Sequence, residues 1–180
     1  MRCKLKSKII ALPIIFGLMS GCTTVFTVGS LDPKPNVDVL GYEGKTISLD
    51  ISSKIKNDFI VPQKNDCLGL DISDFKNSLN KGFEYAYDDS FSVVPQGSDS
   101  DYKIKLLSIQ PYGEVTAVNG NGAAVSCAID IKYKARLEVN GKAIMSSSET
   151  VESKTRSGFN LESAIESMYE VMSKEFFSKN

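Results

Sequence analysis

A long unbroken alternation of apolar and polar residues, from Val125 to Val139, constrains the fold more than any other feature of the chain. The apolar positions are Val125, Cys127, Ile129, Ile131, Tyr133, Ala135, Leu137 and Val139. Because successive side chains of a strand point to opposite faces, this pattern predicts a strand with one buried and one solvent-facing side. The domain therefore contains a sheet that is covered on one face.

The residues that follow this strand, Asn140-Gly141, predict a tight hairpin. Both tolerate the positive φ of a type I′ turn, which is the usual two-residue connection between antiparallel strands. In the resulting register Leu137 lies opposite Ile144. Lys132 lies opposite Glu149, so opposite charges meet on the solvent face.

Two further stretches have the three- and four-residue spacing of amphipathic helices. The first opens with Asp71 and Asp74, whose carboxylates suit the first turn of a helix, and ends at 88–90. The second is capped by Asn160 and runs to the last residues of the chain. Their apolar stripes are Ile72, Phe75, Leu79, Phe83 and Ala86 in the first, and Leu161, Ile165, Met168, Met172 and Phe176 in the second.

The remaining alternating stretches complete the predicted sheet. Strands are expected at 46–51 and 102–109, with a short strand-like segment at 91–94. The alternation in 102–109 shifts phase at Leu107, which indicates a β-bulge. The predicted order is β-α-β-β-β-α, an α+β fold in which two helices pack on one face of an antiparallel sheet.

The first 21 residues have the three-part layout of a secretory signal. Four basic residues fall within residues 1–8, an apolar run occupies 9–19, and small residues precede Cys22. The apolar run is too short to span about 30 Å of hydrocarbon, so a transmembrane anchor is the weaker interpretation. The pattern predicts export from the cytoplasm.

Residues 18–22, Leu-Met-Ser-Gly-Cys, resemble the lipobox of bacterial lipoproteins, although Met19 replaces the usual Leu, Val or Ile. The resemblance implies signal cleavage between Gly21 and Cys22. It also implies a diacylglyceryl cysteine at Cys22 whose freed amine is acylated, with palmitate as the expected label. Two or three acyl chains make such a membrane anchor effectively permanent. By the enterobacterial sorting rule, Thr23 implies the outer membrane, with the domain in the periplasm.

The mature chain retains two cysteines, Cys67 and Cys127, once Cys3 leaves with the signal and Cys22 carries lipid. In an oxidising compartment they predict one disulfide. It would close a loop of about 60 residues and stabilise the fold by roughly 2–4 kcal/mol. Two buried free thiols are the alternative.

Charge and composition exclude several functions. Since four of the 21 basic residues lie in the signal, the mature chain has 17 against 22 acidic residues, a formal charge of −5. The basic residues are scattered, which argues against a nucleic-acid partner. The chain contains no His, so His-based catalysis is excluded and a metal or haem cofactor is not expected. Asp99 and Asp101 lack the distal Glu and central Gly of a calcium loop and indicate a solvated turn. We therefore expect no enzymatic activity.

The chain is predicted to comprise the signal at 1–21, a Gly- and Pro-punctuated tether at 22–36 and one α+β domain at 37–180. Segments 93–95 and 102–106, the Asn140-Gly141 hairpin and the closing helix resemble YajG-like small outer-membrane lipoproteins and the auxiliary lipoproteins of lipid transport systems. The resemblance concerns the fold, and function does not follow from fold alone.

Two surfaces are candidates for partner binding: a Gly- and Asn-rich loop with apolar flanks, and the sheet edge. The loop candidate consists of Tyr112, Val115, Val118, Asn119, Gly120, Asn121 and Gly122. We expect a non-enzymatic binding or scaffold module in a cell-envelope complex, with an envelope protein as its partner. An auxiliary role in lipid or glycolipid transport is the alternative, and it would require an apolar groove between sheet and helices.

Overall fold

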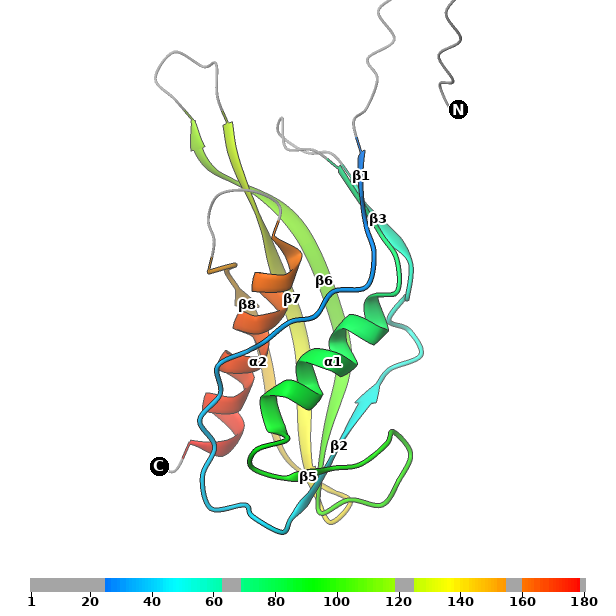
Figure 1. The fold of residues 1–180 in the computed structure, drawn as a ribbon, viewed down its shortest axis with the longest axis vertical. Helices are drawn as coiled ribbons and strands as arrows, with labels where there is room; N and C mark the ends of the chain where they lie inside the picture. The colour runs from blue at the N-terminus through cyan, green and yellow to red at the C-terminus, as the bar shows by residue number, and fades with distance from the viewer. Residues whose placement is uncertain (1–24, 63–68, 119–124, 155–159, 179–180) are drawn as a thin grey trace, which may run out of the picture.

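The computed structural model describes residues 25–62, 69–118, 125–154 and 160–178 (Figure 1). Within these residues the fold is α+β, as predicted, with two helices and two sheets. The strands are β1 (Val25–Val28), β2 (Thr46–Ile51), β3 (Phe59–Val61), β4 (Gly69–Ile72), β5 (Ser92–Val93), β6 (Tyr102–Val118), β7 (Val125–Val139) and β8 (Lys142–Val151). The helices are α1 (Phe75–Tyr87) and α2 (Leu161–Phe177).

The larger sheet has the strand order β5-β2-β6-β7-β8. β6, β7 and β8 are antiparallel neighbours, whereas β2 runs parallel to both β5 and β6. The prediction of an antiparallel sheet is therefore wrong for β2. Parallel neighbours need a crossover connection, and the chain between β2 and β6 provides one through the smaller sheet and α1.

The smaller sheet, with the order β1-β4-β3, was not predicted. β1 is parallel and β3 antiparallel to β4. These strands have only three or four residues, too few to show a period in the sequence. The predicted start of the first helix is also wrong, because Asp71 and Ile72 end β4 and α1 begins at Phe75.

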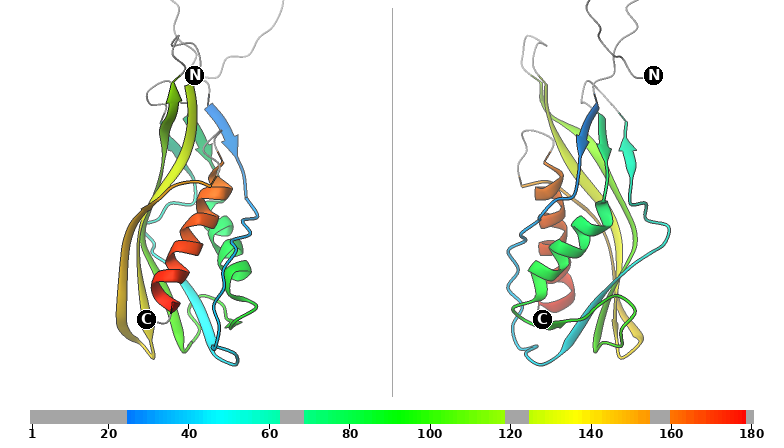
Figure 2. Two further views of the ribbon diagram at one scale, coloured as in Figure 1. Left: turned by 90° about the vertical axis from the view of Figure 1, so that its left-hand side faces the viewer. Right: turned by 45° about the vertical axis from the view of Figure 1, so that its right-hand side comes forward.

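Both helices cover the same face of the larger sheet, as predicted (Figure 2). α2 packs on β7 and β8, and α1 packs on β2 and β5. Every residue of the two predicted apolar stripes is buried. The helices approach closely at Gly82, where an added Cβ would lie 2.9 Å from Cε2 of Tyr169. The Tyr169 hydroxyl donates a hydrogen bond to the carbonyl oxygen of Leu79 on α1 (2.7 Å).

The predicted hairpin turn is confirmed, since Asn140 and Gly141 both have positive φ, at 48° and 74°. The predicted register is wrong beyond the turn. A bulge at Ile144 places Met145 opposite Leu137, and it moves every later pair by one residue. The bulge turns Val151 into the core, where it is 4% exposed, and leaves Ile144 on the surface at 57%.

The described part of the expected tether, residues 25–36, packs against the domain. It contains β1, and we call residues 29–36 the N-terminal strap because they run along the two helices (Figure 1). Backbone amides of residues 31, 34 and 36 donate hydrogen bonds to the side chains of Ser78, Glu166 and Glu170 at 2.9, 3.0 and 2.7 Å. Pro33 and Pro35 are buried. The segment therefore differs from the free tether expected from its Gly and Pro content.

Candidate binding groove

A groove opens where β2 and β6 separate. Their pairing ends at Ile51 and Leu106, and a last hydrogen bond runs from the Ser52 amide to the Leu106 carbonyl oxygen (3.0 Å). The chain after β2 then turns away to form β3 in the smaller sheet, while β6 continues. In the described chain no strand pairs with this side of β6 beyond Leu106. An open edge also accommodates Pro111, which has no amide hydrogen to offer a neighbouring strand.

The resulting β3–β6 groove has a volume of about 500 Å³. Its lining residues are Lys54, Ile55, Lys56, Phe59, Ile60, Val61, Pro62, Phe75, Leu107, Ser108, Ile109, Gln110 and Pro111. Most of these side chains are apolar. Ile55, Val61 and Phe75 are buried, whereas Ile60 and Leu107 are 63% and 37% exposed. The groove therefore presents an apolar surface that solvent can reach.

Leu107 reaches the surface because of the predicted bulge, which the structure confirms. The β6–β7 pairing skips this residue, with Leu106 opposite Ala135 and Ser108 opposite Lys134. An extra residue in one strand changes which face the following side chains occupy. The bulge thus interrupts the inward row of β6 at the point where the groove begins.

The loop between β2 and β3 is fixed to the start of α1. The Asn57 side-chain oxygen accepts the Lys76 amide (3.0 Å), and the Asn57 carbonyl oxygen accepts the Phe75 amide (2.9 Å). Asp58 accepts the amide of Asp74 (3.0 Å), a residue held at a φ of 56°. These bonds satisfy amides at the helix start that have no partner within the helix. One wall of the groove is thereby built on the first turn of α1.

Two lysines stand beside the apolar lining. Lys54 and Lys56 are exposed and flank Ile55, which is 5% exposed and points into the core. Neither ammonium group forms an ion pair with a carboxylate in the described part of the chain. The groove thus combines an apolar surface with two positive charges at its rim.

The polar turn that contains Asp99 and Asp101 connects two strands of the larger sheet through hydrogen bonds. The Asp101 carboxylate accepts hydrogen bonds from the backbone amide and the hydroxyl of Thr46, at 2.9 and 3.0 Å. These bonds, aided by the charge of Lys45, lower the pKa of Asp101. Asp101 therefore joins the starts of β2 and β6. Among the described residues no three His, Cys, Asp or Glu side chains are grouped so that they could hold a metal ion.

Buried tyrosine hydroxyls also have structural partners. Burial raises the pKa of Tyr87, Tyr133 and Tyr169 above the ordinary value of 10.0. Tyr87 shares a hydrogen bond with Ser173 (2.7 Å) and thereby links α1 to α2. A hydroxyl held in this way joins elements of the core and is not poised to transfer protons.

The residues predicted for a partner loop are placed differently from expectation. Tyr112, Val115 and Val118 belong to β6, which extends well past the predicted end at Ile109. They pair with Asp130, Cys127 and Val125 of β7. Asn119, Gly120, Asn121 and Gly122 lie outside the described residues, as do Gly21, Cys22 and Cys67. Cys127 lies in β7 and is 7% exposed.

The groove residues were missed by sequence reasoning, with one partial exception. The phase shift at Leu107 predicts the bulge but does not by itself predict a groove. The residues around Lys54 and Lys56 do not predict a groove from the sequence, because the β2–β3 loop and β6 that form it are segments about 50 residues apart. A bulge beside the end of a neighbouring strand could have located the edge of the groove.

This chain is only distantly similar to the known proteins with which it was compared. No family model matches the chain, and no curated protein matches it. One similar solved structure is a Xanthomonas campestris protein of the family DUF330. It has a TM-score of 0.46 and 16% identity, over 86% of this chain and 92% of that one. Another is a minor lipoprotein from Acinetobacter baumannii, with a TM-score of 0.40 and 12% identity, over 77% and 93% of the two chains.

Both TM-scores lie below 0.5. In the part of the chain that the structure describes, no helix is both long and apolar enough to span a membrane.

Proposed function

We propose that this protein is an outer-membrane lipoprotein whose periplasmic domain is a non-enzymatic binding module of a cell-envelope complex. The lipobox-like residues 18–22 argue for the lipid anchor. One structural observation supports the orientation of the domain at the membrane: β1 begins at Val25, three residues after Cys22. Three extended residues span about 10 Å, so a lipid on Cys22 would hold the β1 end of the domain at the membrane surface.

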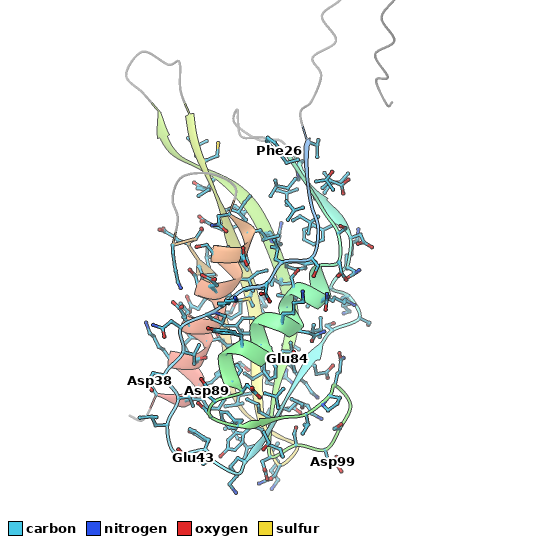
Figure 3. All side chains as sticks on the ribbon, viewed as in Figure 1. Phe26, Asp38, Glu43, Glu84, Asp89 and Asp99 are labelled. Carbon is cyan, nitrogen blue, oxygen red and sulfur yellow. The ribbon has the colours of Figure 1, made fainter. Side chains whose placement is uncertain are left out.

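Exposed apolar residues near the anchor support this orientation. Val25 and Phe26 are 42% and 51% exposed, and they would lie where the protein meets the membrane interface. Figure 3 shows Phe26 where β1 begins, with the other labelled residues further toward the opposite end of the domain. These are the acidic residues Asp38, Glu43, Glu84, Asp89 and Asp99. In the proposed orientation these carboxylates would face away from the lipid headgroups.

The proposal of binding without catalysis rests on the chemistry of the accessible residues. The polar turn at Asp101 and the buried tyrosines have structural partners, whereas the β3–β6 groove is apolar and open to solvent. Apolar concave surfaces with a few polar groups are typical of binding sites. The groove also favours the second candidate function, an auxiliary role in lipid or glycolipid transport, although it lies between β3 and β6 and not between sheet and helices as that role was expected to require.

We further propose a disulfide between Cys67 and Cys127. Cys127 is disulfide-bonded, and the described residues contain no other cysteine. Cys3 would be removed with the signal and Cys22 would carry lipid, which leaves Cys67 as the partner. Mass spectrometry of the non-reduced mature protein should find the two peptides linked. Free thiols at both positions in protein taken from the periplasm would contradict the bridge.

The anchor is tested by replacing Cys22. Wild-type protein expressed with radiolabelled palmitate should carry the label and sediment with outer membranes. The Cys22→Ser variant should be unlabelled and should retain its signal, because the lipoprotein peptidase requires the modified cysteine. Palmitate labelling of this variant would refute the anchor.

The binding role is tested by copurification from detergent-solubilised membranes after chemical cross-linking. We expect the lipidated protein to recover a defined envelope component that the Leu107→Asp variant recovers less. Ile144→Asp is the matched control, since Ile144 is also an exposed apolar residue at a bulge but lies in β8, outside the groove. Equal recovery by both variants would rule out the groove as the binding site.

A further inference from the structure

We infer that the β3–β6 groove binds one acyl chain of an anionic phospholipid, with the lipid phosphate at Lys54 and Lys56. This inference rests on the proposed membrane anchor and names the ligand class of the proposed binding module. Four observations lead to it: the dimensions of the groove, its narrowness, its charge and its place relative to Cys22.

The dimensions suit a hydrocarbon chain. The volume of about 500 Å³ lies within the range of sites for small ligands. The β6 side of the groove runs from Leu107 to Pro111, about 13 Å of extended strand. Such a length holds a stretch of extended acyl chain against Phe59, Val61 and Ile109.

The narrowness of the groove favours an acyl chain over a peptide strand. Cα atoms of β3 and β6 come within 8 Å of one another. A strand inserted between them would need about 9.6 Å, twice the usual spacing of paired strands. Pro111 also withholds one amide hydrogen from any strand that might add to β6. An acyl chain, unlike a strand, needs no hydrogen bonds from either wall.

The charge at the rim identifies the headgroup. Lys54 and Lys56 both line the groove, and neither is engaged by a described carboxylate. A phosphate bound between them would gain attraction from two ammonium groups. The mature chain as a whole is acidic, so two unpaired lysines beside an apolar surface select for an anion at this place.

The position of the groove brings it to the membrane. Strand register puts Val61 level with Phe26, through Leu70 between them. Phe26 follows Cys22 by four residues, at most about 14 Å of extended chain, and two strand spacings add about 10 Å. The Val61 end of the β3 wall would therefore stand close to the headgroups of the membrane that holds the anchor, and the loop of Lys54 and Lys56, which precedes Phe59 at the other end of β3, would lie farther out.

The test uses full-length lipidated protein in nanodiscs with a phosphatidylglycerol that carries a diazirine near the end of one acyl chain. After illumination, mass spectrometry should place the cross-links on peptides that contain residues 54–61 and 107–111. Leu107→Asp and Ile60→Asp each place a charge on the exposed apolar wall and should reduce these cross-links at least about fivefold. Ile144→Asp should leave them unchanged.

The headgroup is tested separately. Wild-type protein should cross-link more strongly to the phosphatidylglycerol probe than to the matching phosphatidylcholine probe. The double variant Lys54→Glu/Lys56→Glu should lose this preference, with a decrease of about tenfold or more for phosphatidylglycerol, as expected for two lysines near an anionic headgroup. Circular dichroism melts would establish that each variant is folded.

Two outcomes would overturn the inference. Cross-links confined to residues 25–28 would indicate simple proximity of the membrane, and equal cross-linking by Leu107→Asp and wild type would exclude the groove. The same experiment in mixed micelles of lipid and detergent does not depend on anchoring. Failure of palmitate labelling with groove cross-links retained would refute the anchor alone, and the reverse result would refute the lipid site alone.

Discussion

The two helices of this domain begin in different ways. α2 is capped by the residue that precedes it, since the Asn160 side chain accepts the amide of Ser163 (2.9 Å). The first amides of α1 are instead bound by Asn57 and Asp58, 19 and 16 residues away from their donors. The start of α2 is therefore specified by residues next to it in the sequence. The start of α1 depends on contacts with a distant segment of the chain.

This difference explains why one helix start was predicted and the other was not. Asp71 and Asp74 have the residue types of a helix start, but Asp71 lies in β4 and Asp74 makes no side-chain cap. The start of α1 is held by hydrogen bonds to the loop between β2 and β3. Residues of the same loop line the groove. The proposed binding region thus lies in the part of the fold whose structure depends on long-range contacts.

The largest loss of stability is expected when a charge is placed on the buried face of β7. Leu137 is 1% exposed, and Leu137→Asp should destabilise the domain by about 4 kcal/mol or more, because a buried carboxylate without a partner is strongly disfavoured. Arg136→Asp, on the outer face next to it, should change the stability by less than about 0.5 kcal/mol. Urea melts measure both. If the order were reversed, the faces assigned to β7 would be wrong.

Gly82→Ala tests the contact between the two helices. Alanine is the better helix former by about 1 kcal/mol, but its Cβ would lie 2.9 Å from the Tyr169 ring. We expect a net destabilisation of about 1–3 kcal/mol, since the ring cannot shift without disturbing its hydrogen bond to Leu79. Glu84→Ala, at an exposed position of the same helix, is the control. A stabilised Gly82→Ala protein would show that the helices have room to separate.

Gly141→Val isolates the local conformational preference of the hairpin. Nothing lies within 4 Å of an added Cβ at Gly141, so the expected loss of about 1–2 kcal/mol comes from the positive φ of 74° alone. At Gly29 an added Cβ also meets nothing, and φ is not in the positive region. Gly29→Val should therefore have little effect when the two variants are compared in thermal melts. Equal losses at the two sites would rule out the turn conformation as the cause.

Asn57→Ala and Asn160→Ala compare the two kinds of cap directly. Each removes one side-chain acceptor from a helix start, and each should destabilise the domain by about 1 kcal/mol. Hydrogen exchange should distinguish them. Asn57→Ala should expose amides in both α1 and the loop of Lys54 and Lys56, whereas Asn160→Ala should affect the first turn of α2. Faster exchange confined to α1 in Asn57→Ala would show that the loop is held by other contacts.

The smallest effect is expected at Asp101, and it should depend on pH. Its pKa is lower in the folded protein than the ordinary value of 3.8, so the unfolded chain binds more protons between these two values. The stability that the carboxylate contributes is therefore present above 3.8 and lost as the pH falls through the lower folded value. The difference in stability between wild type and Asp101→Asn should shrink over that range. A constant difference down to the lowest pH would argue against this linkage.

Features that depend on neighbouring residues were predicted well. The bounds of β2 and β7, the bulge at Leu107, the turn at Gly141 and the cap at Asn160 all follow from local periods or turn chemistry. The bulge at Ile144 was not predicted, because the packing that it improves lies seven residues later, where Val151 enters the core. The smaller sheet and the groove were missed because their parts come from separate segments of the chain.

If Cys22 carries the proposed lipid, the parallel pairing of β1 with β4 has a mechanical consequence. β1 starts at the end nearest the anchor and pairs with β4 at every residue from Val25 to Val28. A pull on the anchor would act along the strand axis, so the β1–β4 hydrogen bonds would be loaded in shear and would have to break together. The N-terminal strap continues the same path with its bonds to both helices. Tension from the membrane would thus be shared between the smaller sheet and the helical layer before it could reach the larger sheet.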